Sequence, residues 1–171
     1  MDNNDVYVLK ELDKYVSLTE YLQSQGHQIR YVVLQQDIIE ANRWISKKLQ
    51  IPLASKVFSF KKLRIVDDVP KSIDHVYLSY DRVPGIEKLN LADKSFYSVL
   101  KEYYNIQVVR NEEELAIANA DREEAELLNL HEGDEVMITR GSTYVNTFEP
   151  LEYFEITAVT SFYRYRSVST V

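Results

Sequence analysis

The sequence predicts a single α+β domain in which helices flank a central antiparallel sheet. The chain has 171 residues, a length that suits one domain, and 45% of them are hydrophobic, as in ordinary globular proteins. Segments with apolar residues at helical spacing alternate with β-rich segments. A helix–strand–strand pattern also occurs twice along the chain. A duplicated unit of this kind predicts hairpins that share one sheet, and therefore one domain instead of two.

The first helix is predicted from the residues that begin and end it. Ser17 and Glu20 form a capping-box pattern, in which each side chain can hydrogen-bond the backbone amide of the other residue. Gly26 is a natural stop, so this helix covers about residues 18–25. The elements expected next are a strand at 29–38 and a helix at 40–49 that cannot continue through Pro52.

A long hairpin is predicted for the middle of the sheet. Residues 57–66 have the composition of a strand, Asp67–Asp68 that of a turn, and 70–80 that of the returning strand. After a loop, we expect Asp93 to cap a third helix that ends at about Tyr104.

The C-terminal half continues the alternation of strands and helices. A strand is expected within 106–118, and its acidic run 112–114 is interpreted as a solvated sheet edge. Asp121 and Glu124 repeat the capping-box pattern and begin a helix that reaches about Asn129. A second hairpin and a last short strand complete the prediction, at 135–144, 151–160 and 162–168.

The internal repeat relates the two halves. Its landmarks recur 79 residues later, or 80 at the prolines: Ala41-Asn42, Leu49, Val57 and Pro70 in the first copy, and Ala120-Asp121, Leu128, Val136 and Pro150 in the second. The repeat predicts a pseudo-symmetric sheet built largely from antiparallel hairpins.

Composition and charge exclude several classes of function. The absence of cysteine rules out disulfides, thiolate metal sites and cysteine nucleophiles, and it fits a cytoplasmic protein. The net charge of −7 argues against bulk DNA or anionic membrane binding by this chain, because phosphate binding relies on clustered Lys and Arg. No apolar run approaches the ~18 residues of a membrane span, and the first residues do not show the basic-then-apolar pattern of a signal peptide. Metal and nucleotide-loop motifs are also missing, so we expect no metal and no cofactor.

Candidate anion-binding residues lie on the long strand and at two helix starts. Lys62 and Arg64 are two residues apart, so both point to one face of the strand. Thr19 and Ser95 each lie in the first turn of a predicted helix, where backbone N–H groups favour anions. These groups could build a small anion site. The alternatives are ordinary helix capping and a cross-strand salt bridge on an exposed sheet face.

Two carboxylates occupy related positions in the repeat, because Asp74 follows Pro70 and Glu152 follows Pro150. A three-residue loop at Asp67 would place Asp74 opposite Lys62, whereas a two-residue loop would place it on the other face. The carboxylates could hydrogen-bond ligand hydroxyls or amines, or form a general acid/base pair.

Several successive motifs carry a resemblance to a known family, from about residue 15 to residue 165. They are Ser17-Leu18-Thr19-Glu20 before Gly26, Lys62-Leu63-Arg64, Asp67-Asp68-Val69-Pro70, Ile73-Asp74 with Tyr77-Leu78, Val83-Pro84-Gly85-Ile86, Ser95-Phe96-Tyr97 with Leu100, and Pro150-Leu151-Glu152-Tyr153. In order and spacing this set resembles the effector-sensing (UTRA) domain of GntR-type transcription regulators of the HutC subfamily.

The resemblance implies a chorismate-lyase-like fold, no catalysis, and a pocket for a small anionic metabolite, most often a phosphorylated sugar. It implies phosphate contacts from Thr19, Lys62, Arg64 and Ser95, and sugar contacts from Asp74, Tyr97 and Glu152. The sensing domain is expected at 15–168, after a linker or arm at 1–14. The expected partners are the effector, a second copy in a homodimer, and DNA, the last only through an N-terminal winged helix-turn-helix domain absent from this chain.

The chain also departs from the family pattern. Lys62 stands where an Arg is frequent, which keeps the charge but loses the bidentate geometry of a guanidinium. Asp74 replaces a frequent Glu, and 159–163 replaces a stretch rich in Arg, Gly and Asp that often lines the pocket. These two departures concern residues that the resemblance places near the sugar end of the effector. Two alternatives stay open: a chorismate-lyase-like enzyme that binds a dicarboxylate, and a sensor of a non-phosphorylated organic acid.

Overall fold

The computed structural model describes residues 6–11, 17–146 and 148–170. The strands are β1 (Val8–Glu11), β2 (Ile29–Glu40), β3 (Lys56–Val66), β4 (Val69–Ser79), β5 (Arg110–Asn119), β6 (Glu135–Tyr144), β7 (Pro150–Val159) and β8 (Tyr163–Arg166). The α-helices are α1 (Leu18–Ser24), α2 (Arg43–Leu49), α3 (Phe96–Tyr104) and α4 (Arg122–Leu128), and two short 3-10 helices lie at Tyr80–Arg82 and Ile86–Lys88. Every predicted helix and strand is present, which confirms the α+β class.

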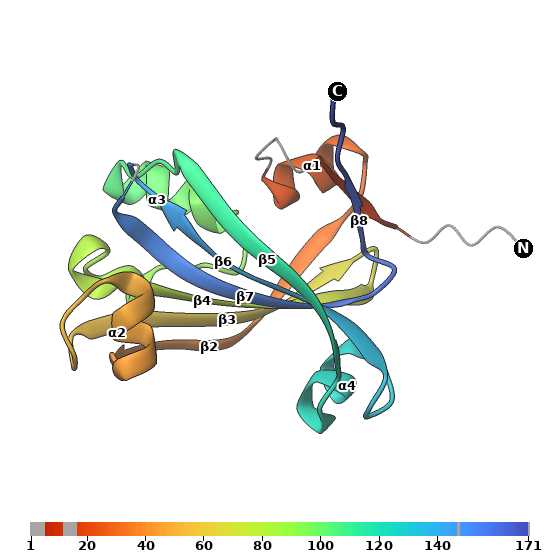
Figure 1. The fold of residues 1–171 in the computed structure, drawn as a ribbon, viewed down its shortest axis with the longest axis horizontal. Helices are drawn as coiled ribbons and strands as arrows, with labels where there is room; N and C mark the ends of the chain where they lie inside the picture. Colours follow the sequence, from red (N-terminus) through yellow and green to blue (C-terminus); the bar gives the residue numbers. More distant parts are fainter. Residues whose placement is uncertain (1–5, 12–16, 147, 171) are drawn as a thin grey trace, which may run out of the picture.

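The centre of the domain is a six-stranded sheet in the order β2-β3-β4-β7-β6-β5 (Figure 1). All neighbouring strands in it are antiparallel. The helices α2 and α4 lie on one side of the sheet, and α1, α3 and the small parallel pair β1–β8 lie on the other (Figure 1). The sheet therefore has a helix-covered core on each face.

Strand alternation divides β3 between these two cores. Phe58 and Phe60 are buried against α3, with Val99 and Leu100. Leu63 and its odd-numbered neighbours on β3 pack toward α2 and α4 on the opposite face. Lys62 and Arg64, which have even numbers, therefore point to the α1 and α3 side, and both are buried.

The predicted repeat is visible in the backbone hydrogen bonds. Ala41 N donates to Ser55 O at 2.8 Å, and Ala120 N donates to Asp134 O at the same distance. The two helices also begin alike, since Asn42 caps α2 and Asp121 caps α4 with a full capping box. Each copy includes one more strand than predicted, giving β2-α2-β3-β4 and β5-α4-β6-β7. The copies meet where β4 pairs with β7 at the centre of the sheet.

A β-bulge, and not the loop length, sets the register of the β3–β4 hairpin. The turn is a two-residue loop, because Val66 pairs with Val69. By the loop rule above, Asp74 would then lie on the opposite face from Lys62. However, the register shifts between Arg64 and Ile65, because Lys71 is an extra residue on β4. The shift brings Asp74 directly opposite Lys62. The expectation that this pairing requires a three-residue loop is therefore wrong, because a two-residue loop followed by a bulge gives the same pairing.

Two further predictions need correction or completion. Ser95, and not Asp93, is the N-cap residue of α3, and the Asp93 carboxylate instead accepts a hydrogen bond from Asn90. The predicted arm at 1–14 includes the strand β1, while residues 1–5 and 12–14 and the predicted domain start at residue 15 lie outside the described residues. None of the described helices has the length and hydropathy that crossing a membrane would require.

The repeat supplies its own test of backbone strain. Ala54 and Gly133 occupy the same position in the two copies, both exposed and both in the left-handed region, with φ of 63° and 91°. A side chain costs about 1 kcal/mol in that conformation. We expect Ala54→Gly to raise the free energy of unfolding by about 0.5–1 kcal/mol and Gly133→Ala to lower it by about 1 kcal/mol. Urea titration measures both, and a destabilised Ala54→Gly variant would contradict the expectation.

Candidate functional site

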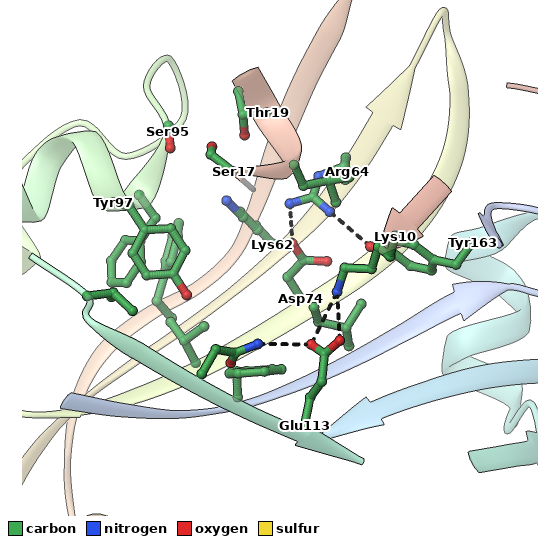
Figure 2. A pocket seen from close by; sticks show the side chains of 18 of the residues that line it. Lys10, Ser17, Thr19, Lys62, Arg64, Asp74, Ser95, Tyr97, Glu113 and Tyr163 are labelled. Carbon is green, nitrogen blue, oxygen red and sulfur yellow. Dashed lines mark hydrogen bonds and ion pairs between the residues drawn. The ribbon is translucent and has the colours of Figure 1, made fainter. Parts of the chain in front are cut away.

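A cavity of about 530 Å³ lies on the side of the sheet that carries α1 and α3. Its walls come from β1, α1, β3, β4, α3, β5, β7 and β8 (Figure 2). Apolar rings such as Phe60, Phe96 and Phe154 form part of the wall, and charged side chains gather at several points. An apolar cavity with a few convergent polar groups is typical of a small-molecule site.

The buried ammonium of Lys62 marks one end of the cavity. Its Nζ lies 4.1 Å from the centre of the Tyr31 ring, within the range of a cation–π contact. Burial, and then the neighbouring Arg64 guanidinium, lower the pKa of Lys62 from 10.5 to about 8. At neutral pH this side chain is therefore mostly charged, although it is removed from water.

Three hydroxyl side chains, those of Ser17, Thr19 and Ser95, line the cavity together with this ammonium (Figure 2). The Thr19 hydroxyl is held by the Tyr31 hydroxyl at 2.5 Å. Ser95 makes no side-chain capping hydrogen bond to α3, although it occupies the N-cap position. The alternative that Ser95 serves only as a helix cap is therefore not supported. An ammonium that shares a cavity with hydroxyl donors is suited to holding an anion.

Arg64 and Asp74 form an ion pair in the floor of the cavity, with Arg64 Nη2 2.7 Å from Asp74 Oδ2. Both side chains are buried, at 6% and 7% exposed, so the alternative of a salt bridge on an exposed sheet face is wrong. The Ser72 hydroxyl donates to Asp74 at 2.8 Å, and Arg64 also donates to the Tyr163 hydroxyl at 3.5 Å. These contacts hold Arg64 in place, while its buried Nε has no hydrogen-bond partner in the described part of the chain.

Glu152 lies behind the cavity wall and contacts it through Tyr97. The Tyr97 hydroxyl, which faces the cavity (Figure 2), donates a hydrogen bond to Glu152 Oε1, and the Thr143 hydroxyl donates to the same oxygen at 3.2 Å. Burial raises the pKa of Glu152 to about 7, against the effect of these two hydrogen bonds. Glu152 thus titrates near neutrality and orients the Tyr97 hydroxyl.

The structure brings the predicted residues together. Thr19, Lys62, Arg64, Asp74, Ser95 and Tyr97 all line the cavity, and Glu152 is the one that does not. The sequence analysis missed other lining residues, among them Lys10, Ser17, Glu113 and Tyr163. Tyr163 falls in the 159–163 stretch, which the resemblance assigned to the pocket wall.

Glu113 could have been found from strand alternation. It was placed with Glu112 and Glu114 on a solvated edge, and Glu112 does lie outside, beside Arg110 and Tyr144. Glu113 points the other way, into the cavity, where Lys10 Nζ lies 3.2 Å from it. The interpretation of the acidic run as a solvated edge is therefore wrong for Glu113.

Comparison with known proteins gives a consistent set of relatives. The family described as the UTRA domain matches residues 24–164. The HTH-type transcriptional regulator YurK of Bacillus subtilis is 28% identical over 142 residues, which cover 83% of this chain and 59% of YurK. An Escherichia coli (strain K12) transcriptional repressor named for a fructoselysine utilization operon is 27% identical over 116 residues, covering 68% of this chain and 47% of the repressor.

A solved structure agrees in fold. The effector domain of PhnF from Mycobacterium smegmatis matches with a TM-score of 0.86 at 17% identity, over 96% of this chain and 100% of that domain. The chain spans about half the length of the curated relatives it matches.

The charge on Lys62 should cost stability at neutral pH. The folded-state pKa of about 8 lies below the ordinary 10.5, so the unfolded state binds the proton more tightly between these values. The cost is therefore fully present below pH 8 and is relieved as the pH rises toward 10.5. We expect Lys62→Met to raise the free energy of unfolding at pH 7 by about 1–3 kcal/mol, and to give a smaller gain near pH 10.

Thermal unfolding at the two pH values measures this difference. The matched control is Lys56→Met, at the exposed start of the same strand, where we expect a change within about 0.5 kcal/mol at both pH values. A Lys62→Met variant that is less stable than the parent at pH 7 would show that the ammonium contributes structural stability instead.

Proposed function

The chain belongs to the UTRA domain family, and on this premise we propose that it is the effector-sensing domain of a GntR-type transcriptional regulator of the HutC subfamily. The effector we propose is a small phosphorylated sugar. The observation that carries the proposal is the buried Lys62 ammonium, which lines one cavity together with the hydroxyl side chains of Ser17, Thr19 and Ser95.

The chemistry of this end suits a phosphate group. A phosphate offers three acceptor oxygens, and the ammonium and three hydroxyls are donors from α1, β3 and α3 and their N-terminal flanks. Hydrogen bonds to a charged group contribute roughly 1.5–3 kcal/mol each. Arg64 could add its buried Nε–H, while its other nitrogens stay on Asp74, Ser72 and Tyr163.

The sugar would lie over the middle of the cavity. Tyr97 presents its hydroxyl there, oriented by Glu152, and Asp74 presents a carboxylate held by Arg64 and Ser72. The Tyr97 oxygen and the Asp74 carboxylate can accept hydrogen bonds from sugar hydroxyls. The Escherichia coli relative named for fructoselysine utilization is consistent with a sugar-derived effector.

In the complete regulator, we propose that effector binding modulates DNA binding by a separate winged helix-turn-helix domain. YurK, which bears the HTH-type name, is longer than this chain and leaves room for such a domain. A cytoplasmic homodimer that binds paired half-sites fits this arrangement. We assign no catalytic residue, since the relatives are named as regulators.

The first test is a ligand screen by thermal shift with hexose phosphates, the corresponding free hexoses, organic acids and chorismate. A hexose phosphate at 100 times its dissociation constant should add about 2.7 kcal/mol to the free energy of unfolding. Stabilisation by organic acids alone would favour the non-phosphate sensor, and release of pyruvate from chorismate would favour the enzyme.

Ser95→Ala tests the anion end directly. We expect the dissociation constant for the best hexose phosphate to rise about tenfold or more, because a hydrogen bond to a charged oxygen is lost. The fold should be unaffected, since Ser95 does not cap α3 with its side chain. Ser98→Ala, on the exposed face of the same helix, is the control and should bind normally. Equal affinities for the two variants in isothermal titration calorimetry would contradict the assignment.

The pKa of Lys62 gives the binding a pH signature. Loss of its proton above pH 8 should weaken phosphate binding, so the dissociation constant should rise between pH 7.5 and 9.5. In Lys62→Arg the charge persists, because a guanidinium keeps its proton at these pH values. That variant should therefore show a flat profile over the same range. A parent profile as flat as that of the variant would remove Lys62 from the anion site.

A further inference from the structure

Tyr31 contacts the Lys62 end of the cavity from outside the cavity wall. It lies on β2, pairs with Arg64 of β3, and is 8% exposed. Within the described part of the chain, the residues that line the cavity of about 530 Å³ do not include Tyr31. Tyr31 instead lines a second cavity of about 190 Å³, and Thr19 and Ser95 line both cavities. Tyr31 therefore lies in the partition between the two cavities, where it supports the Lys62 end without lining it.

The ring of Tyr31 lies beside both buried cations of β3. The ring centre is 4.1 Å from Lys62 Nζ and 5.6 Å from Arg64 Cζ. Both distances are within the range of cation–π attraction, which is stronger when the cation is removed from water. Among the described residues, the Lys62 ammonium has ring contacts with Tyr31 and Phe60 and no hydrogen bond or ion pair. The Tyr31 ring is the nearer of the two, so it is the group that fixes the position of this ammonium.

The hydroxyl of Tyr31 fixes a second member of the same end. Its oxygen lies 2.5 Å from Thr19 Oγ1, and both side chains are buried. Each hydroxyl has a single O–H to donate. When the Thr19 hydroxyl donates to a bound anion, the Tyr31 hydroxyl must therefore be the donor between the two. A chain of two hydroxyls that ends on an anion is strengthened, because its hydrogen bonds polarise one another.

We propose that Tyr31 is the positioning residue of the anion site, because its ring holds the Lys62 ammonium and its hydroxyl directs the Thr19 hydroxyl toward the ligand. This inference rests on the proposed function, since it takes the Lys62 end to bind the phosphate of the effector. Tyr31 adds affinity without touching the ligand. Two donors, one from α1 and one from β3, are ordered before the phosphate arrives, which lowers the entropic cost of binding.

The two parts of the Tyr31 side chain can be removed separately. Tyr31→Phe keeps the ring and removes the hydroxyl, whereas Tyr31→Leu removes both. Methyl phosphate is the probe, because it is a monoester like a sugar phosphate and tests the anion end alone. The second pKa of a phosphate monoester is about 6, so the probe keeps a nearly constant charge between pH 7 and pH 9.5.

The pH profile of the dissociation constant tests the ring. The Asp74 and Glu152 carboxylates raise the pKa of Lys62, while burial and the Arg64 guanidinium lower it to about 8. The ring adds to the favourable side, so in Tyr31→Leu the affinity should be lost at a pH about half a unit lower, or more. Tyr31→Phe should keep the parent profile. A Tyr31→Leu variant that binds more weakly by the same factor at every pH would show only a structural defect and would overturn this role of the ring.

A double-mutant cycle with Thr19→Ala tests the hydroxyl. At pH 7.5, Tyr31→Phe and Thr19→Ala should each raise the dissociation constant for methyl phosphate about threefold or more, as measured by NMR titration. The double variant should be no weaker than Thr19→Ala alone, because the Tyr31 hydroxyl acts through Thr19. Losses that multiply would mean that the two hydroxyls act independently, which contradicts the proposed chain.

Tyr165→Phe is the matched control. It removes another contact between a tyrosine and a threonine hydroxyl, since Tyr165 Oη lies 3.4 Å from Thr139 Oγ1. Of the described residues that line the cavity, neither of these two is one. Tyr165→Phe should therefore bind methyl phosphate as the parent chain does. A loss as large as that in Tyr31→Phe would show that the effect is not specific to the anion site, and the positioning role would be abandoned.

The positioning role and the proposed function can fail separately. Methyl phosphate binding that Lys62→Met abolishes, but that both Tyr31 variants leave unchanged, would overturn the role of Tyr31 and leave the phosphate sensor standing. A parent chain that does not bind methyl phosphate would overturn both proposals.

Discussion

The bulge at Lys71 is the constraint on which the rest of the site depends. Without the extra residue, the two-residue turn would place Asp74 on the α2 and α4 face of the sheet. Arg64 would then remain buried without its carboxylate, at a cost of several kcal/mol. With the bulge, the charged side chains of two adjacent strands meet on one face and satisfy one another. The register of this one hairpin therefore decides whether the buried cations of β3 have a carboxylate beside them.

The charged floor of the cavity is an arrangement for recognition more than for stability. Burial and the Arg64 guanidinium lower the pKa of Lys62 to about 8, against the opposite effect of the Asp74 and Glu152 carboxylates, and burial raises the pKa of Glu152 to about 7. Hydrophobic residues at these positions would stabilise the fold more. Proteins commonly retain such costs at binding sites, where preorganised charges favour the ligand over water. The apolar clusters on both faces of the sheet offset this cost.

Sequence patterns within single segments predicted most of the helices and strands. The features that were missed depend on how distant segments pair with one another. Capping boxes at Ser17 and Asp121 located two helices, and the repeat located the paired hairpins. The bulge could not be foreseen, because polar and apolar residues do not alternate strictly along β4, so one residue more on this strand leaves no mark in the pattern. Asp93 looked a better cap than Ser95, since both types are favoured and only the loop geometry separates them. Glu113 was missed because a run of three acidic residues at a sheet edge is typical of a strand face exposed to solvent. Lys10 was missed because β1 is short and pairs with a strand from the far end of the chain.

The parallel pairing of β1 with β8 bears on the order in which the molecule assembles. Val8 pairs with Tyr163, so nearly the whole chain forms the loop that this contact closes. Contacts of such sequence separation carry a large entropic cost and tend to form late, after the two repeat units have organised around their local hairpins. Lys10 and Tyr163 reach the cavity on these same strands, so its wall is completed only at that late stage. A ligand that binds to residues of β1 and β8 would therefore act mainly on the rate of unfolding. It would lengthen the lifetime of the native state and leave the rate of folding nearly unchanged.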